Sequence, residues 1–327
     1  MFTTFRGIIY LNSLLFLLLG CANSPQTHQL LATPPSSLPI EIELTSTPFI
    51  SQTENYCGPA ALATVLQAQG RAVTISELGE LLYLPQREGS LQIEMDATAR
   101  SFEMLSYPLS GNISDLLTEV SAGNPVLVFQ NLGLSWYPRW HYAVVIGFDL
   151  EQGEIILRSG TIKRYVINLS TFEQTWRRTD YWARVVVAAD KIPVTATALK
   201  FIKAVNALET SGHIETAAQA YRKAATRWPQ NITVLQAWGN SEFEQGAFAE
   251  AESAFRQAIT VNPTTASVWN NLAYVLMARQ CTQGAREAIR CARKLSPDDE
   301  NIIASENDIS QIKPSRGKSC AVLQCSE

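Results

Sequence analysis

Histidine and clustered basic residues are scarce in this sequence. Among 327 residues there are three histidines, and the 26 Lys and Arg residues are outnumbered by 30 Asp and Glu, for a formal net charge of -4. Nucleic-acid binding needs a concentrated basic face, so the composition argues against a nucleic-acid partner. With 46% hydrophobic residues, the chain is long and apolar enough for about two globular domains.

A long apolar run is also missing, except near the N-terminus. Residues 8–20, IIYLNSLLFLLLG, follow a single arginine and are shorter than the ~20 residues of a membrane-spanning helix. They indicate a secretory signal, and Leu18-Leu19-Gly20-Cys21 resembles a bacterial lipobox. Residues 1–21 are therefore expected to be a lipoprotein signal peptide with Cys21 as the acylated residue. A plain signal peptide is the alternative. Ala22 favours a periplasm-facing protein on the outer membrane of the cell envelope.

Residues 22–48 are rich in Pro, Ser and Thr and show no helical or strand period, which predicts a flexible tether. An exported chain can form disulfides, and the sequence has six cysteines. Besides Cys21 and Cys57, which is treated below, these are Cys281, Cys291, Cys320 and Cys325. Pairs Cys281–Cys291 and Cys320–Cys325 are compatible with the sequence, which does not choose among the pairings.

The region after Thr197 matches itself at a shift of about 34 residues. Recurring positions include Ala217, Ala251 and Ala285; Tyr221, Phe255 and Ile289; and Pro229, Pro263 and Pro297. Small residues let paired helices approach closely, and proline ends the second helix of each pair. Residues 198–299 resemble three tetratricopeptide repeats, which implies an all-α solenoid that binds a peptide or protein partner. A helical lid is the alternative, and residues 300–327 are left as a C-terminal tail.

Residues 49–190 have a different pattern. Pro59 suits a first helical turn and Gly70 an exit, so the stretch CGPAALATVLQAQ predicts a helix with Cys57 at its N-terminus. Free backbone N–H groups and the helix dipole there favour a thiolate, which predicts a lowered pKa for Cys57. Further helices, two of them marked by capping-box patterns at Thr74 and Ser170, and then strand-like runs predict an α+β domain.

A thiolate nucleophile needs a base, and the histidines leave one candidate. His28 lies in the tether and His213 at a repeat turn, whereas His141 opens the apolar strand HYAVVIGF. A group that is half charged near neutral pH is costly to bury without a partner. A lone strand histidine is more often a structural residue whose hydrogen bonds are satisfied. Together with a helix-terminal cysteine, His141 is expected to be a catalytic base.

The stretches QTENYCGPAALATVL and HYAVVIGFD resemble the papain-like cysteine peptidases that process double-glycine leader peptides of bacteriocins, over roughly residues 49–188. The resemblance implies a papain-like fold in a stand-alone form, with Cys57 as nucleophile and His141 as base. It also implies that Gln52 and the Cys57 backbone N–H bind the oxyanion. It implies neither a cofactor nor a metal. No nucleotide-binding loop is present, so this is not the transporter-fused form.

The third catalytic member departs from that family, in which an Asp usually follows on the next strand. The corresponding stretch reads Leu157-Arg158-Ser159-Gly160. Asp149 is eight residues from His141, roughly 26 Å along a strand, and is expected to be a turn residue. Ser159 and Asn131 remain as candidate partners of the imidazole, since the papain arrangement uses a neutral Asn.

These features lead to three hypotheses for function. The first is a lipid-anchored cell-envelope cysteine peptidase that cleaves a peptide at Cys57, with repeats that bind the substrate or a protein partner. The second is a catalytically impaired, peptidase-like binding or scaffold module. An amidase or transglutaminase-type acyl transferase is a third hypothesis, because Cys-His chemistry serves other acyl acceptors.

Overall fold

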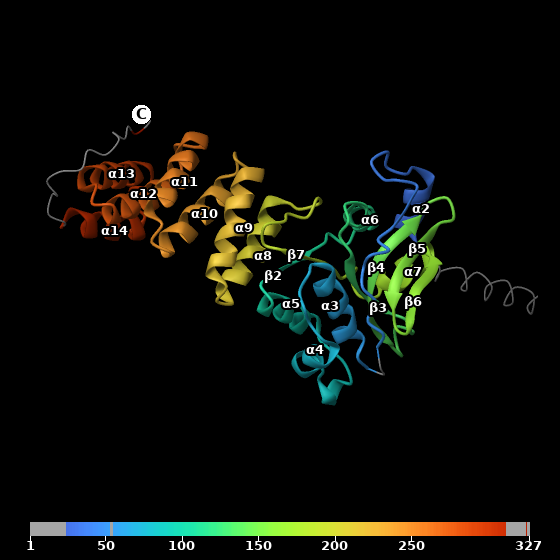
Figure 1. Cartoon of the computed structure of the whole chain (residues 1–327). Coiled ribbons are helices and arrows are strands. Elements are labelled where there is room, and N and C mark those ends of the chain that lie inside the picture. The colour runs from blue at the N-terminus through green and yellow to red at the C-terminus, as the bar shows by residue number, and fades with distance from the viewer. Residues whose placement is uncertain (1–23, 53–54, 312–324, 326–327) are drawn as a thin grey trace, which may run out of the picture. The chain divides into compact units, whose positions relative to one another are not determined.

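A computed structural model describes residues 24–52, 55–311 and 325 (Figure 1). The chain forms two compact units. The first holds most of the chain up to residue 187 and also residues 193–195, and the second holds the helices from residue 198 onward. Cys21 and Cys320 lie outside the described residues. None of the described helices combines the length and the apolar character needed to cross a bilayer.

The first unit begins its helical part at α3 (Cys57–Ala68), whose residues 58–66 are all buried. The Thr74 side chain accepts a hydrogen bond from the Glu77 backbone N–H at the start of the next helix, as the capping-box pattern predicts. Asn112 caps a later helix through the Ser114 N–H. These helices are α4 (Ile75–Leu82), the 3₁₀ helix η2 (Pro85–Arg87), α5 (Gln92–Ser101), α6 (Ile113–Ser121) and α7 (Leu169–Arg177).

A sheet of seven strands lies beside these helices, in the order β2-β7-β3-β4-β5-β6 with β1 paired to β4. Strand β4 pairs antiparallel with β1, β3 and β5, as β3 does with β7 and β5 with β6. The register sets Gln130 of β3 opposite His141 of β4. The α+β prediction is thereby confirmed. The strands are β1 (Glu41–Glu43), β2 (Met104–Pro108), β3 (Val126–Asn131), β4 (Trp140–Asp149), β5 (Glu154–Ser159), β6 (Ile162–Asn168) and β7 (Ala183–Ala188).

The described part of the expected tether is ordered, which corrects the prediction for residues 22–48. Helix α2 (Pro25–Ala32) is fixed at its start, because both carboxylate oxygens of the buried Glu173 accept hydrogen bonds from the Gln26 and Thr27 backbone N–H groups. The Gln26 side chain also bonds Gly111 and Ile113 backbone groups. Strand β1 then pairs with β4. These are contacts across long sequence separations, so the local composition did not reveal them.

The second unit consists of antiparallel helix pairs whose small residues sit where the period places them. A Cβ added at Gly239 would lie 2.7 Å from the Phe255 ring, so only glycine allows this approach of neighbouring helices. Gly212 and Gly246 turn between paired helices at φ of 94° and 75°, and Gln280 takes the same place at 64°. The helices are α8 (Ala198–Thr210), α9 (Ile214–Arg227), α10 (Ile232–Glu244), α11 (Phe248–Val261), α12 (Ala266–Ala278) and α13 (Thr282–Leu295).

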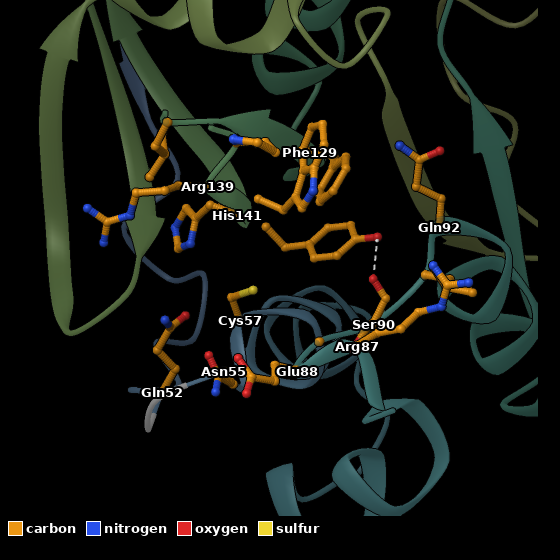
Figure 2. A pocket seen from close by; sticks show the side chains of 16 residues that line it. Gln52, Asn55, Cys57, Arg87, Glu88, Ser90, Gln92, Phe129, Arg139 and His141 are labelled. Atoms are coloured by element: carbon orange, nitrogen blue, oxygen red, sulfur yellow. Dashed lines mark hydrogen bonds between the residues drawn. The ribbon is translucent and has the colours of Figure 1, made fainter. Parts of the chain in front are cut away.

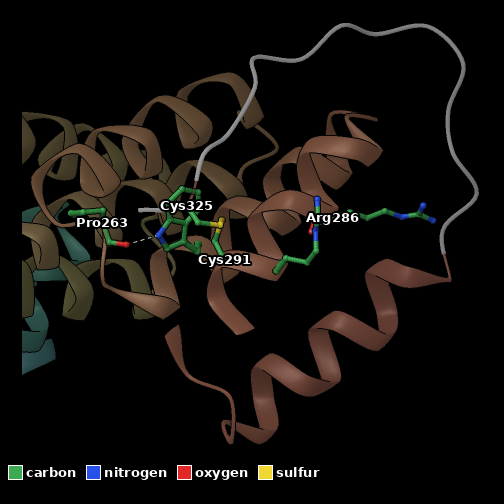
Figure 3. The surroundings of a disulfide bond; sticks show 6 residues. Pro263, Arg286, Cys291 and Cys325 are labelled. Carbon is green, nitrogen blue, oxygen red and sulfur yellow. Dashed lines mark hydrogen bonds between the residues drawn. A yellow bond between two sulfur atoms is a disulfide. The ribbon is translucent and has the colours of Figure 1, made fainter. Parts of the chain in front are cut away.

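The C-terminal tail prediction is wrong for its first third. Helix α14 (Glu300–Ser310) is capped by Asp299 and buries Ile302 and Ile309. Farther along, Cys325 forms a disulfide with Cys291 of α13 (Figure 3). Cys281 is also disulfide-bonded. The Cys291–Cys325 disulfide uses one cysteine from each of the two pairings considered from the sequence, so both pairings are wrong.

Candidate active site

Cys57 is the first residue of α3, as predicted, and it is the one free cysteine within the described residues. It sits between the helix and β4, where its sulfur is within hydrogen-bonding reach of the Tyr142 backbone N–H. Gly58 follows it in close contact with a neighbouring loop, since an added Cβ would lie 2.5 Å from Ser90 Oγ. A larger residue at position 58 would push the helix start away from this loop, so the glycine helps to position the thiol.

His141 lies on β4 and contacts Ser159, the last residue of β5. The Nε2 atom of the imidazole is 2.8 Å from Ser159 Oγ. The sequence left two candidates for this partner, and the geometry selects Ser159. The Asn131 side chain is bonded instead to the turn after β3, where its Oδ1 accepts from the Gly133 and Arg139 backbone N–H groups. Asp149 accepts from the Gln152 backbone N–H, as a turn residue does.

Gln52 lies on the same side of the site as these groups. Its backbone N–H bonds to the Gly160 carbonyl oxygen at 3.3 Å, which ties it to the turn that follows Ser159. Gln52, Cys57 and His141 all line one cavity of about 880 Å³, within the size range of binding pockets. Figure 2 shows the imidazole above the thiol, with Gln52 beside them.

The pKa of Cys57 is shifted in the direction opposite to the sequence-based prediction. Burial raises the pKa of the thiol above its ordinary value, and hydrogen bonds from the backbone N–H groups of Tyr142, Gly58 and Cys57 itself offset only part of this effect. The helix terminus was expected to lower the pKa. Desolvation is stronger here because nearly all of α3 after Cys57 is packed in the core. At neutral pH the resting cysteine is consequently a thiol.

The pKa of His141 is shifted downward. Burial and then the positive charge of Arg139 lower its pKa to about 4. A hydroxyl partner such as Ser159 cannot stabilise an imidazolium as a carboxylate would. The resting site therefore holds a neutral thiol and a neutral imidazole.

Sequence reasoning missed the aromatic wall of the site. Phe129 lies between Trp140, Tyr142 and Trp182, with ring centroids 5.5, 4.4 and 6.4 Å away. Phe129, Trp140 and Tyr142 also line the cavity that contains Cys57. The signal was present as the aromatic-rich stretch SWYPRWHY directly before and at His141. No cluster of His, Cys, Asp or Glu suited to a metal occurs in the part of the chain that the structure describes.

A cysteine at a helix start that faces a strand histidine across an α+β cleft is the arrangement of papain-like cysteine peptidases. Consistent with it, residues 44–183 match the family model described as Peptidase_C39 like family, and residues 237–300 match a tetratricopeptide repeat model. The protein therefore joins a Peptidase_C39-like domain to tetratricopeptide repeats, and the resemblance inferred from the sequence is confirmed.

A tetratricopeptide repeat-containing protein from Pseudomonas aeruginosa is 28% identical over 158 residues, which make up 48% of this chain and 24% of that protein. The chain thus spans about a quarter of the length of this curated relative. Among solved structures, the first repeat domain of human RPAP3 is 22% identical, and the Arabidopsis OM64 repeat domain 16%. Each match covers 35% of this chain, and 90% and 96% of those chains respectively, with a TM-score of 0.33.

Proposed function

We propose that the protein is a cysteine peptidase of the bacterial cell envelope, with Cys57 as its nucleophile. One observation carries the proposal most strongly. The His141 imidazole is fixed 2.8 Å from Ser159 Oγ and shares a cavity of about 880 Å³ with Cys57 and Gln52. The cavity is open and large enough for an extended peptide segment.

The proposed reaction begins with proton transfer from the thiol. In the tautomer that donates from Nε2 to Ser159, the Nδ1 atom of His141 is free to accept the Cys57 proton. The lowered pKa keeps the imidazole in this basic form at neutral pH. The sulfur then attacks the carbonyl carbon of the scissile peptide bond and forms a tetrahedral intermediate.

The remaining steps use the groups around the sulfur. The Gln52 side-chain amide and the Cys57 backbone N–H donate hydrogen bonds to the oxyanion, a contribution of about 3 kcal/mol in comparable sites. His141 returns the proton to the leaving amine as the C–N bond breaks. Water, deprotonated by His141, hydrolyses the thioester and releases the second product.

The proposal extends to the parts of the chain outside the cleft. Acylation of Cys21 would hold the protein on the outer membrane, facing the periplasm, since several acyl chains bind a bilayer durably. The repeats would bind the substrate or a protein partner along their helices.

A second candidate function, a catalytically impaired binding module, is favoured by one specific observation. The thiol pKa is raised and the imidazole pKa lowered, so transfer of the proton from sulfur to nitrogen is costly in the empty site. Substrate binding would have to offset that cost, through the oxyanion donors, for turnover to occur.

Digestion of a complex peptide library separates the two candidates. Wild-type protein and Cys57→Ala are incubated with the library, and new N-termini are counted by mass spectrometry. We expect cleavage by the wild type alone, with peptides sharing a sequence preference around the cut. Binding of the same peptides by both proteins with no new N-termini from either would favour the binding module.

A further inference from the structure

The turn after β3 and the first residue of β4 carry the three most exposed aromatic side chains of the described residues. Trp136 is 81% exposed, Tyr137 68% and Trp140 55%, and two leucines of the same segment are about half exposed. We refer to residues 132–140 as the aromatic hairpin. Exposed aromatic and leucine side chains that gather in one short segment are typical of an interaction surface.

The exposure belongs to an ordered hairpin. Leu134 and Tyr137 exchange two backbone hydrogen bonds of 3.1 and 3.2 Å around its tip. At its base, Asn131 Oδ1 accepts from two backbone N–H groups, and a Cβ added at Gly133 would lie 2.4 Å from the Tyr137 carbonyl oxygen. The aromatic side chains are thus held outward by a fixed backbone, and they are available to a partner without rearrangement.

The start of the described chain is fixed on the same domain. Ser24 is only 1% exposed, and Gln26 and Thr27 donate backbone hydrogen bonds of 3.1 and 2.7 Å to Glu173. Ser24 comes three positions after Cys21, a reach of about 10 Å when fully extended. An acyl chain on Cys21 would therefore hold this part of the domain within about 10 Å of the lipid headgroups.

One short helix connects this attachment point to the aromatic hairpin. Glu173 lies within α7, and Arg178 is the C-cap of the same helix. Arg178 Nη1 donates to the Asn131 and Gly133 carbonyl oxygens at 3.2 and 2.6 Å, at the base of the hairpin. Arg178 comes five residues after Glu173, about 8 Å along the helix, so the attachment point and the base of the hairpin lie near each other.

We propose that the aromatic hairpin rests in the headgroup region of the bilayer that holds Cys21. The inference builds on the proposed lipid anchor. Trp and Tyr side chains favour the membrane interface, where an apolar ring and a polar edge are both accommodated, and Arg139 adds a positive charge suited to anionic headgroups. The hairpin is the second membrane signal, beside the acyl chains.

This placement defines the class of substrate. Leu132, Arg139 and Trp140 line the same cavity as Cys57 and His141, so one rim of the cleft would lie at the membrane surface. Peptide segments that emerge from the bilayer or lie on it reach the cleft directly. The preferred substrates are accordingly membrane-associated peptides, and soluble peptides of the same sequence are cut more slowly.

Fluorescence quenching by brominated lipids tests the contact. Purified full-length protein is reconstituted in vesicles of phosphatidylethanolamine and phosphatidylglycerol, with bromine placed near the headgroups. We expect quenching of the wild type that falls in Trp136→Phe and is mostly lost when Trp140→Phe is added, because both indoles belong to the aromatic hairpin. The control, Trp182→Phe, removes an indole that is only 9% exposed and should leave the quenching unchanged. Quenching that Trp136→Phe does not reduce would overturn the inference.

Mass spectrometry of the N-terminal peptide separates this inference from the proposed anchor. Acylated Cys21 with unquenched Trp136 sinks the hairpin contact and keeps the anchor. Quenched Trp136 on a chain without acyl groups supports the contact and removes the anchor. A dimer that Trp136→Ala dissociates, with no quenching by lipid, would assign the hairpin to a second copy and overturn the proposal.

Discussion

The repeats and the cleft of the first unit hold their titratable groups in different ways. In the repeats, the fully buried Glu242 accepts hydrogen bonds from Arg222 and Trp238, and Glu252 pairs with two arginines. In the Peptidase_C39-like domain, Cys57 and His141 are kept neutral by burial. In the repeats the buried carboxylates have charged partners, whereas burial in the cleft shifts the pKa values of two reactive groups so that both are neutral, as happens at functional sites.

The largest effect, a loss of activity in the cleft, is expected from Gln52→Ala. Loss of one oxyanion donor should lower kcat by about 10²–10³-fold, with little change in KM, because the hydrogen bond is strongest in the transition state. Steady-state kinetics on a peptide found by library digestion measure it. Gln92→Ala, on another part of the cavity wall, is the matched control and should keep its kcat. A rise in KM alone would make Gln52 a substrate-binding residue.

Acid should destabilise the Peptidase_C39-like domain through His141. The unfolded chain takes up the imidazole proton near pH 6.5, whereas the folded chain takes it up only near 4. The free energy of unfolding should therefore fall between pH 6.5 and 4, by about 3 kcal/mol, and level off below that range. Urea unfolding at several pH values measures this slope. It should be absent in His141→Gln and retained in His213→Gln; equal slopes in all three proteins would contradict the assignment.

A smaller loss of unfolding free energy is expected in the repeats from Glu242→Gln. The neutral amide still fills the buried site but no longer provides the charged acceptor for Arg222, at a cost of about 2 kcal/mol in unfolding free energy. Thermal unfolding of the repeat helices by circular dichroism measures it. Peptide cleavage should stay at the wild-type rate. A stable repeat unit with this substitution would remove the contrast between the units.

The smallest effect on activity is expected at Ser159, whose hydroxyl positions the His141 imidazole. Ser159→Ala should lower kcat about tenfold, since the imidazole loses one neutral hydrogen bond. Ser159→Asp supplies the carboxylate that related peptidases have, and it should raise the pKa of His141. The acid limb of the pH–rate profile would then move up from about 4. A profile unmoved by Ser159→Asp would show that Ser159 has only a structural role.

Features with a local sequence signal could be predicted. The start of α3 at Cys57 follows from Pro59 and the small-residue run, and the repeats follow from their period. His141 could be placed on a strand by its apolar neighbours. The sequence left Ser159 and Asn131 as candidate partners of the imidazole. It could not decide between them, because the turn after β3 takes up the Asn131 side chain in backbone hydrogen bonds.

Features fixed by distant contacts could not be predicted. Helix α2 depends on Glu173, which is 147 residues from Gln26. The sequence pattern instead predicted a capping box between Ser170 and Glu173, but α7 begins one residue before Ser170 and has Asn168 as its N-cap. The Cys291–Cys325 disulfide depends on where the chain returns after α14. The direction of the Cys57 pKa was missed for the same reason, since the helix terminus is local and desolvation is a property of the whole fold.

Alkylation of Cys57 against pH tests the central claim, a neutral thiol beside a neutral imidazole. Iodoacetamide modification is followed by mass spectrometry on the Cys57 peptide alone, in wild type and in His141→Gln. The account predicts an apparent pKa above the ordinary value of about 8.5 and nearly the same curve in the variant. Rapid modification at mildly acidic pH that disappears in His141→Gln would show a thiolate–imidazolium pair and contradict it.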